Sequence, residues 1–150
     1  MVQGQGKFVA KPFFVNEFVS TMDAMGETLK SALKALVERG WVDPKQTFYA
    51  QLCLEEALVN AVEHGNRRDA AKTVRIELSE EGECCLIRVY DQGSGFVPAD
   101  IHLPELEQVN GRGICLIRYC MENVNYDNDK KCLEMRMRRN ALCQGEPCHE

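Results

Sequence analysis

Apolar residues at three- and four-residue spacing predict two amphipathic helices in the first half of the chain. The first follows Ser20 or Thr21, either of which can cap a helix, and ends at Gly40. The second is predicted to begin at Asp43-Pro44-Lys45-Gln46, a typical helix start, and to end near His64-Gly65-Asn66. The apolar stripes are Met25, Leu29, Leu33, Leu36 and Val37 in the first helix and Leu54, Ala57, Leu58, Ala61 and Val62 in the second.

Alternating apolar and polar residues predict two β-hairpins after these helices. Residues 73–78 and 85–90 form the first, around Glu81-Gly82, and residues 123–126 and 132–138 form the second. Residues 7–19 are expected to add a strand near a sheet edge, because Pro12 interrupts them and proline cannot donate to a sheet. Helices and antiparallel strands in separate runs indicate the α+β class.

The rest of the chain has weaker patterns. Residues 97–110 show no period and are expected to form a surface loop, whereas residues 113–122 return to a helical pattern. No internal boundary divides the folded part, so we expect one domain over residues 1–138, followed by a flexible tail over residues 139–150.

Composition narrows the class of protein. The chain has 150 residues and a net charge of -5, which argues against direct binding to nucleic acid. It has no apolar run near the roughly 18 residues of a membrane span and no signal-peptide core, so a cytoplasmic protein without a membrane partner is expected. Its eight cysteines include no Cys-x-x-Cys, so we interpret them as reduced apolar residues. Metal binding by Cys143, Cys148 and His149 in the tail stays open as the less favoured alternative.

Three short motifs carry candidate chemistry. Glu56 and Asn60 lie one turn apart on the second helix, so a potential acid/base group neighbours a neutral oxygen ligand for Mg²⁺. Asp91-Gln92-Gly93-Ser94-Gly95 follows a strand, and its glycines let the backbone approach a flat ligand. Asn110-Gly111-Arg112-Gly113 opens a helix, where backbone N–H groups and a cation suit an anion. Taken singly, each is also compatible with a solvated helix face, a loop or a helix cap.

In this order the motifs resemble those of the Bergerat-fold ATPases, the group of gyrase, Hsp90, histidine kinases and MutL. Residues 56–60 resemble the N box, residues 91–95 the first glycine box and residues 111–113 the second. Asn60-Ala61-Val62-Glu63-His64-Gly65 and residues 111–118 are similar to the small anti-sigma-factor serine kinases. The resemblance covers residues 7–138 and implies a two-layer sandwich, with a mixed, mostly antiparallel sheet covered on one face by helices.

The resemblance also implies a role for each motif residue. Asp91 would bind the adenine amine of ATP, with Gly93 and Gly95 passing close to the base, and Asn60 would ligate Mg²⁺. Glu56 would act as general base toward a serine or threonine hydroxyl, and residues 97–110 would close as a lid. Glu55, on another face of the helix, is given no catalytic role, and His64 either approaches the phosphates or simply closes the helix. The phosphates would be held by Gly111, Arg112 and Gly113.

The function implied is that of an ATP-dependent protein-serine/threonine kinase acting as an anti-sigma factor. It would phosphorylate a STAS-domain anti-sigma-factor antagonist and bind a sigma factor, and the apolar first strand permits a homodimer. Two alternatives stay open: a nucleotide-dependent protein-binding module without phosphotransfer, and a histidine-kinase catalytic domain, which is disfavoured because no phospho-accepting helical hairpin precedes it.

Overall fold

Five strands form one open sheet in the order β1-β2-β3-β5-β4 within the part of the chain that the structure describes. This structure is a computed structural model, and it describes residues 11–93, 121 and 123–139. Every neighbouring pair of these strands is antiparallel. The strands are β1 (Phe14–Val19), β2 (Thr73–Glu81), β3 (Cys84–Tyr90), β4 (Asn123–Asp127) and β5 (Cys132–Arg138).

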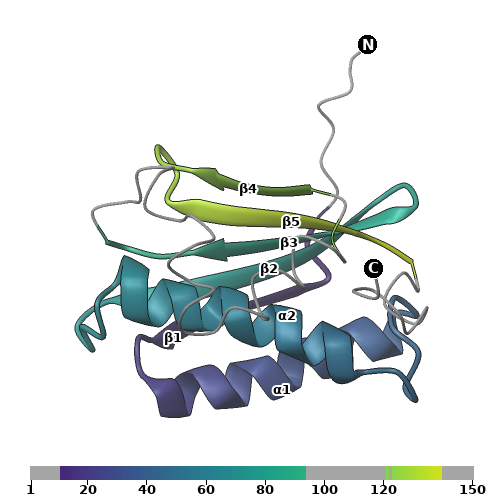
Figure 1. The fold of residues 1–150 in the computed structure, drawn as a ribbon, viewed down its shortest axis with the longest axis horizontal. Helices are drawn as coiled ribbons and strands as arrows, with labels where there is room; N and C mark the ends of the chain where they lie inside the picture. The colour runs from purple at the N-terminus through teal and green to yellow at the C-terminus, as the bar shows by residue number, and fades with distance from the viewer. Residues whose placement is uncertain (1–10, 94–120, 122, 140–150) are drawn as a thin grey trace, which may run out of the picture.

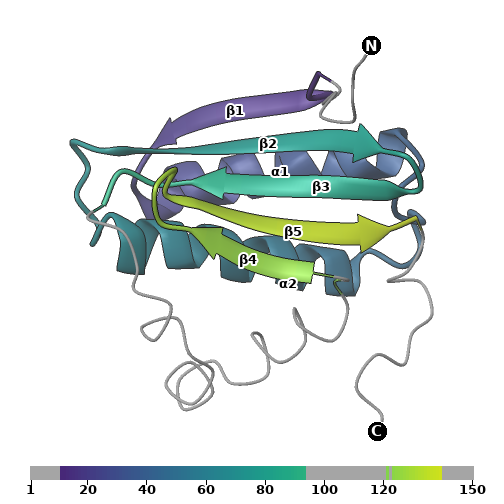
Figure 2. The same cartoon turned by 90° about the horizontal axis from the view of Figure 1, so that it is seen from above.

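Two helices, α1 (Met22–Glu38) and α2 (Phe48–Val59), cover one face of this sheet (Figure 1). Figure 2 shows α1 behind β2 and β3, and α2 behind β4. The helix layer and the antiparallel sheet confirm the α+β class and the predicted two-layer fold. Strand β1 lies at one edge of the sheet, as the position of Pro12 led us to expect.

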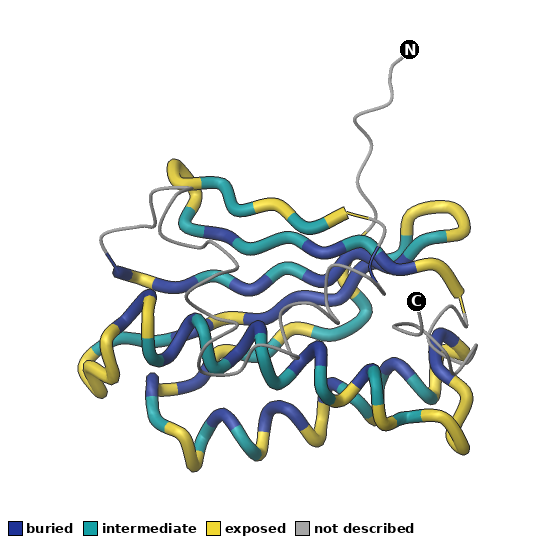
Figure 3. The backbone as a smooth tube through the Cα atoms, viewed as in Figure 1, coloured by how far each residue is buried: buried dark blue, intermediate teal, exposed yellow. Residues whose placement is uncertain are grey.

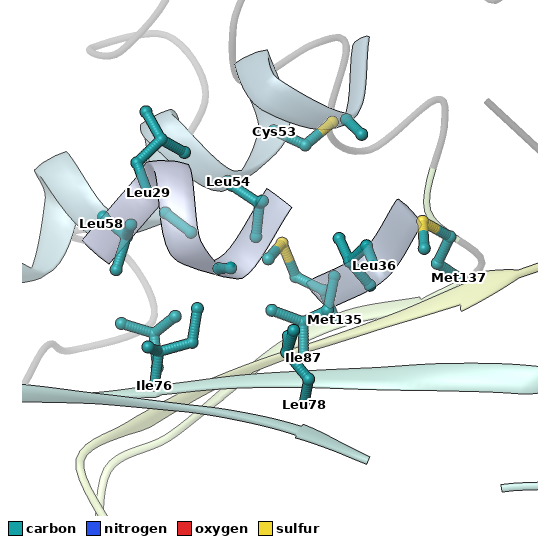
Figure 4. Close-up of a cluster of buried hydrophobic side chains, with 14 of the residues drawn as sticks. Leu29, Leu36, Cys53, Leu54, Leu58, Ile76, Leu78, Ile87, Met135 and Met137 are labelled. Carbon is teal, nitrogen blue, oxygen red and sulfur yellow. The ribbon is translucent and has the colours of Figure 1, made fainter. Parts of the chain in front are cut away.

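The hydrophobic core lies between the two layers, where the buried positions of helices and strands face each other (Figure 3). Leu36 of α1 and Leu54 and Leu58 of α2 are fully buried against alternate residues of the sheet (Figure 4). Each such side chain contributes about 1.5–3 kcal/mol through the apolar surface that it removes from water. The sheet side of this core includes Ile76, Leu78, Ile87, Met135 and Met137.

Helix α1 begins and ends as predicted. The Thr21 hydroxyl accepts a hydrogen bond from the Ala24 N–H at 3.2 Å, which satisfies one of the free donors at the helix start. Gly40 follows the helix with a φ of 80°, a conformation that glycine adopts without strain. Of the predicted stripe, Leu33 and Val37 are only partly buried.

The predicted start of the second helix is wrong by several residues. Residues 43–46 form a turn, in which the Asp43 carboxylate accepts from the Lys45 N–H at 2.8 Å and the Asp43 carbonyl from the Gln46 N–H at 2.8 Å. Asp43 therefore satisfies the local donors in a turn, which competes with its use as a helix cap. Trp41, just before this turn, is fully buried, and its indole N–H donates to Glu80 at 2.8 Å. This anchor holds the turn beside the sheet, and α2 begins only at Phe48.

Both predicted hairpins are confirmed; β2, β3 and β4 are slightly longer than expected, and β5 has the predicted bounds. The β2–β3 turn contains Gly82 at a φ of 61°, and the β4–β5 turn is held by Asp127, whose carboxylate accepts from the N–H groups of Asp129 and Lys130. The predicted loop over 97–110, the predicted helix over 113–122 apart from Met121, and the tail over 140–150 lie outside the described residues.

The described cysteines form no disulfide, in agreement with their interpretation as apolar residues. Burial raises the pKa of the Cys85 thiol to about 12 and that of Cys132 to about 11, so both stay protonated at neutral pH. Within the same residues, no helix has the length and apolar character needed to cross a membrane.

Candidate functional site

Helix α2 presents Glu56 at a half-buried position near its C-terminal end. Burial raises the pKa of the Glu56 carboxyl, and the negative charge of Glu55 raises this pKa further. Glu55, for which no catalytic role is expected, therefore makes Glu56 more basic through its charge. A carboxylate with a raised pKa is a better proton acceptor, as general-base catalysis requires.

Asn60 lies where the α-helix changes into a π-helix, η1 (Asn60–Gly65). The Asn66 N–H donates to the Ala61 carbonyl at 2.9 Å, five residues back, as in a π-turn. Sequence reasoning treated the whole stretch as a regular helix, because hydrophobic spacing does not distinguish a short π-turn from an α-turn. Such turns are rare in proteins overall, and many of those that occur are found at functional sites. The turn directs the end of the helix toward the end of strand β3.

Asp91 directly follows strand β3 and is only 6% exposed. One carboxylate oxygen, Oδ1, accepts from the Gly93 N–H at 2.8 Å, and the other, Oδ2, accepts from the Tyr126 hydroxyl at 3.0 Å. The Asp91 backbone N–H donates to the Lys131 carbonyl at 3.0 Å, which extends the pairing of β3 with β5 by one step. Asp91 is therefore a buried carboxylate with a fixed orientation.

Two glycines allow the helix end and the strand end to touch. A Cβ atom on Gly65 would lie 2.6 Å from Cγ of Asp91, and a Cβ atom on Gly93 would lie 1.7 Å from the Gly65 carbonyl oxygen. Both distances are too short for any side chain. We interpreted Gly93 as permitting approach to a ligand, and the structure gives it a further reason, the contact with Gly65.

Asn66 joins three chain segments at this crossing and is fully buried. Its side-chain N–H group donates to the Ser20 hydroxyl at 3.2 Å and to the Thr73 carbonyl at 2.9 Å. Its Oδ1 accepts from the Gln92 N–H at 2.7 Å. Sequence reasoning used Asn66 only as a sign of the helix end and missed this role. The one available signal was a polar residue directly after His64-Gly65, between two apolar elements.

The end of the helix that carries the first motif thus contacts the turn of the second motif, and the third motif lies outside the described residues. Residues from 60 to 66 connect the helix of Glu56 and Asn60 to the turn of Asp91 and Gly93. His64 is exposed. The predicted site residues Gly95, Gly111, Arg112 and Gly113 lie outside the described residues. Tyr126 and Asn66 were not predicted.

The described residues offer a neutral oxygen ligand that is compatible with a nucleotide-bound Mg²⁺. The described part of the chain contains no group of three histidine, cysteine or acidic side chains that could hold a metal ion. Mg²⁺ in nucleotide sites is usually held by one or two protein oxygens together with phosphate oxygens and water. Asn60 offers one such neutral oxygen at the start of the π-helix, one turn after Glu56.

The helix-covered sheet and the paired motifs define a domain of the ATP-binding type. The model of the histidine kinase-like ATPase domain matches residues 18–139, and the chain belongs to this family. Membership implies that the protein binds a nucleotide. A comparison with curated proteins gives no match.

Proposed function

We propose that the protein is an ATP-dependent protein kinase that phosphorylates a serine or threonine of a partner protein. The observation that carries this proposal is Glu56, a half-buried carboxyl with a raised pKa, one turn before Asn60 in an ATPase domain. A protein that only bound nucleotide would not need a general base at this position.

In this proposal each motif residue has a separate task. Asn60 holds the Mg²⁺ ion, which neutralises phosphate charge when bound. Asp91 accepts a hydrogen bond from the adenine amine, and Gly93 and Gly95 keep side chains away from the base. The phosphates lie against Gly111, Arg112 and Gly113, at the start of the helix expected over residues 113–122.

Glu56 takes the proton of the incoming hydroxyl. The hydroxyl oxygen attacks the γ-phosphorus, the bond from that phosphorus to the bridging oxygen breaks, and ADP leaves. Phosphoryl transfer depends mainly on positioning and on charge neutralisation, and a positioned base adds typically 10²–10⁴-fold. The negative charge of Glu55 supports this role because it raises the proton affinity of Glu56.

The partner class in this proposal comes from the resemblance of residues 60–65 and 111–118 to anti-sigma-factor kinases. The substrate is then a STAS-domain antagonist, and a sigma factor is the protein held in check. A homodimer through β1 is part of the same proposal. Its support is that β1 is an edge strand with two exposed apolar residues, Val15 and Val19.

The proposal is tested by incubating the protein with a STAS-domain protein, ATP and Mg²⁺. Phosphotransfer is detected by mass spectrometry as phosphoserine or phosphothreonine in the STAS-domain protein. Glu56→Ala is expected to bind ATP and to lose transfer by at least about 100-fold. Asn60→Ala is expected to lose the Mg²⁺-dependent part of ATP binding. Glu27→Ala, at an exposed position of α1, is the matched control and should behave like the parent.

The outcomes separate a kinase from a nucleotide-dependent binding module. If Glu56→Ala transfers phosphate as fast as the parent, Glu56 is not the base. If the parent binds ATP and the partner but transfers nothing, the protein regulates by capture alone and the kinase proposal is rejected.

A further inference from the structure

Tyr126 lies on the same face of the sheet as Asp91, although the two residues are far apart in sequence. Tyr126 pairs with Leu133, and Leu133 pairs with Val89, so the three residues form a row across β4, β5 and β3. Val89 is buried in the core, and Leu133 packs against the core. Asp91 is two residues beyond Val89, and alternation along a strand gives both the same face. The Tyr126 ring therefore extends along the helix-covered face to the end of β3.

Tyr126 is one of two donors to the Asp91 carboxylate within the described residues. Its hydroxyl donates to Oδ2 at 3.0 Å, while the Gly93 N–H donates to Oδ1 at 2.8 Å. Each carboxylate oxygen has two acceptor positions, so these two bonds orient the carboxylate without using its full acceptor capacity. Burial and the negative charge of Asp91 raise the pKa of Tyr126, so the hydroxyl keeps its proton and its role as donor at neutral pH.

We propose that Tyr126 is a specificity-determining residue, whose hydroxyl holds the Asp91 carboxylate so that it selects a 6-amino purine over a 6-oxo purine. The inference rests on the proposed contact of Asp91 with the adenine amine. An amino group donates to the free acceptor positions of this carboxylate, whereas the 6-oxo group of guanine offers a second acceptor and is repelled. Without the hydroxyl, Oδ2 loses this donor, and among the described donors only the Gly93 N–H still orients the carboxylate. Tyr126 acts on the base through Asp91, so it is a positioning residue.

The role of Tyr126 in base selection is tested by measuring nucleotide binding to the parent and to Tyr126→Phe. The nucleotides are ATP, GTP and purine riboside triphosphate; the last of these lacks the 6-amino group. Isothermal titration calorimetry with Mg²⁺ present gives the three dissociation constants. The phenylalanine variant keeps the ring and removes only the hydroxyl. We expect its affinity for ATP to fall by about tenfold, the size typical of a lost hydrogen bond to a charged group. Its affinity for purine riboside triphosphate should change by less than about twofold, so the preference for the 6-amino group falls.

Tyr90→Phe is the matched control. Tyr90 is on the neighbouring strand β3, and its hydroxyl lies 3.5 Å from Glu77, on the sheet face opposite to the helices. This variant also loses one tyrosine hydroxyl from the same sheet, but it should keep all three affinities of the parent. Thermal unfolding of both variants checks that the fold is retained.

The possible results distinguish this inference from the proposed function. If the parent does not bind ATP, both are overturned. If the parent prefers ATP to purine riboside triphosphate and Tyr126→Phe keeps the same preference, Tyr126 has no role in selection, and the proposed kinase function stands. An equal loss for all three nucleotides in Tyr126→Phe would show a structural role only and would also reject the inference.

Discussion

Replacing Asn66 by alanine tests whether one buried amide holds the crossing together. The change removes the three hydrogen bonds to Ser20, Thr73 and Gln92. A typical hydrogen bond contributes about 0.5–1.5 kcal/mol net, so the sum is about 3 kcal/mol. Asn66 is fully buried and Ser20 is 1% exposed, so water does not readily replace the lost partner at that end. Since a domain of this size has about 5–15 kcal/mol in total, the loss is a large fraction of its stability.

Urea unfolding measures this change directly. The chain has a single tryptophan, Trp41, which is fully buried, so its fluorescence reports the loss of the folded state. Asn66→Ala should lower the midpoint and leave the denaturant dependence unchanged, because the surface exposed on unfolding is nearly the same. Asn125→Ala, at an exposed position of β4, is the control and should stay within about 0.5 kcal/mol of the parent.

Asn66→Asp distinguishes the contribution of the amide oxygen, an acceptor, from that of the amide N–H group, a donor. The carboxylate keeps an acceptor for the Gln92 N–H but cannot donate to the Thr73 carbonyl, so we expect a loss at least as large as for alanine. A loss below about 1 kcal/mol for both variants would refute the account of Asn66 as the residue that joins the three segments.

Four further changes test other parts of the structure. Gly65→Ala places a Cβ atom 2.6 Å from Cγ of Asp91, so we expect a loss of about 1–3 kcal/mol in urea unfolding and a clear loss of ATP affinity by calorimetry. Glu56→Gln should stabilise the fold slightly at pH 7, because burial raises the folded pKa of Glu56 above its ordinary value and the ionised form is disfavoured in the folded state. In unfolding measured against pH, this advantage should disappear below pH 4.5, where the carboxyl is protonated in both states, and should appear as the pH rises through the folded pKa. Gly26→Ala should raise the unfolding free energy by about 0.5–1 kcal/mol, because Gly26 is inside α1 with no atom within 4 Å of the added Cβ. Gly82→Ala, at a φ of 61°, should lower it by about 1–2 kcal/mol.

The predicted elements that agree with the structure are those with a clear hydrophobic period. Helix α1 and the two hairpins follow from spacing, a capping threonine and turn residues, all of which act over a few positions. The predicted start of α2 is wrong because a contact distant in sequence outweighs the local signal. Its local signal at residues 43–46 was strong, but Trp41 and its long-range hydrogen bond to Glu80 fix the preceding chain beside the sheet. A tertiary contact overrode local preference there.

The difference between local signals and contacts distant in sequence also separates the predicted site residues from those that were not predicted. Glu56, Asn60, Asp91 and Gly93 belong to motifs that are continuous in sequence. Asn66 and Tyr126 act through partners that are distant in sequence: Asn66 is 46 positions from Ser20, and Tyr126 is 35 positions from Asp91. No pattern in a single sequence reports which residue reaches such a partner, so these roles become visible only in the three-dimensional structure.

The π-turn explains why the two motifs lie at a fixed separation. Six residues from Asn60 to Gly65 form one wide turn, so no flexible loop lies between the proposed metal ligand and the glycine that touches Asp91. In a regular α-helix each residue turns the chain by about 100°, so taking one residue out of this stretch would rotate Gly65 away from the carboxylate and direct a side chain toward it. Because neither Gly65 nor Gly93 tolerates a Cβ atom, such a rotation would open the crossing that Asn66 holds. The wide turn therefore sets the distance between the part of the site proposed to hold Mg²⁺ and the part proposed to hold the base.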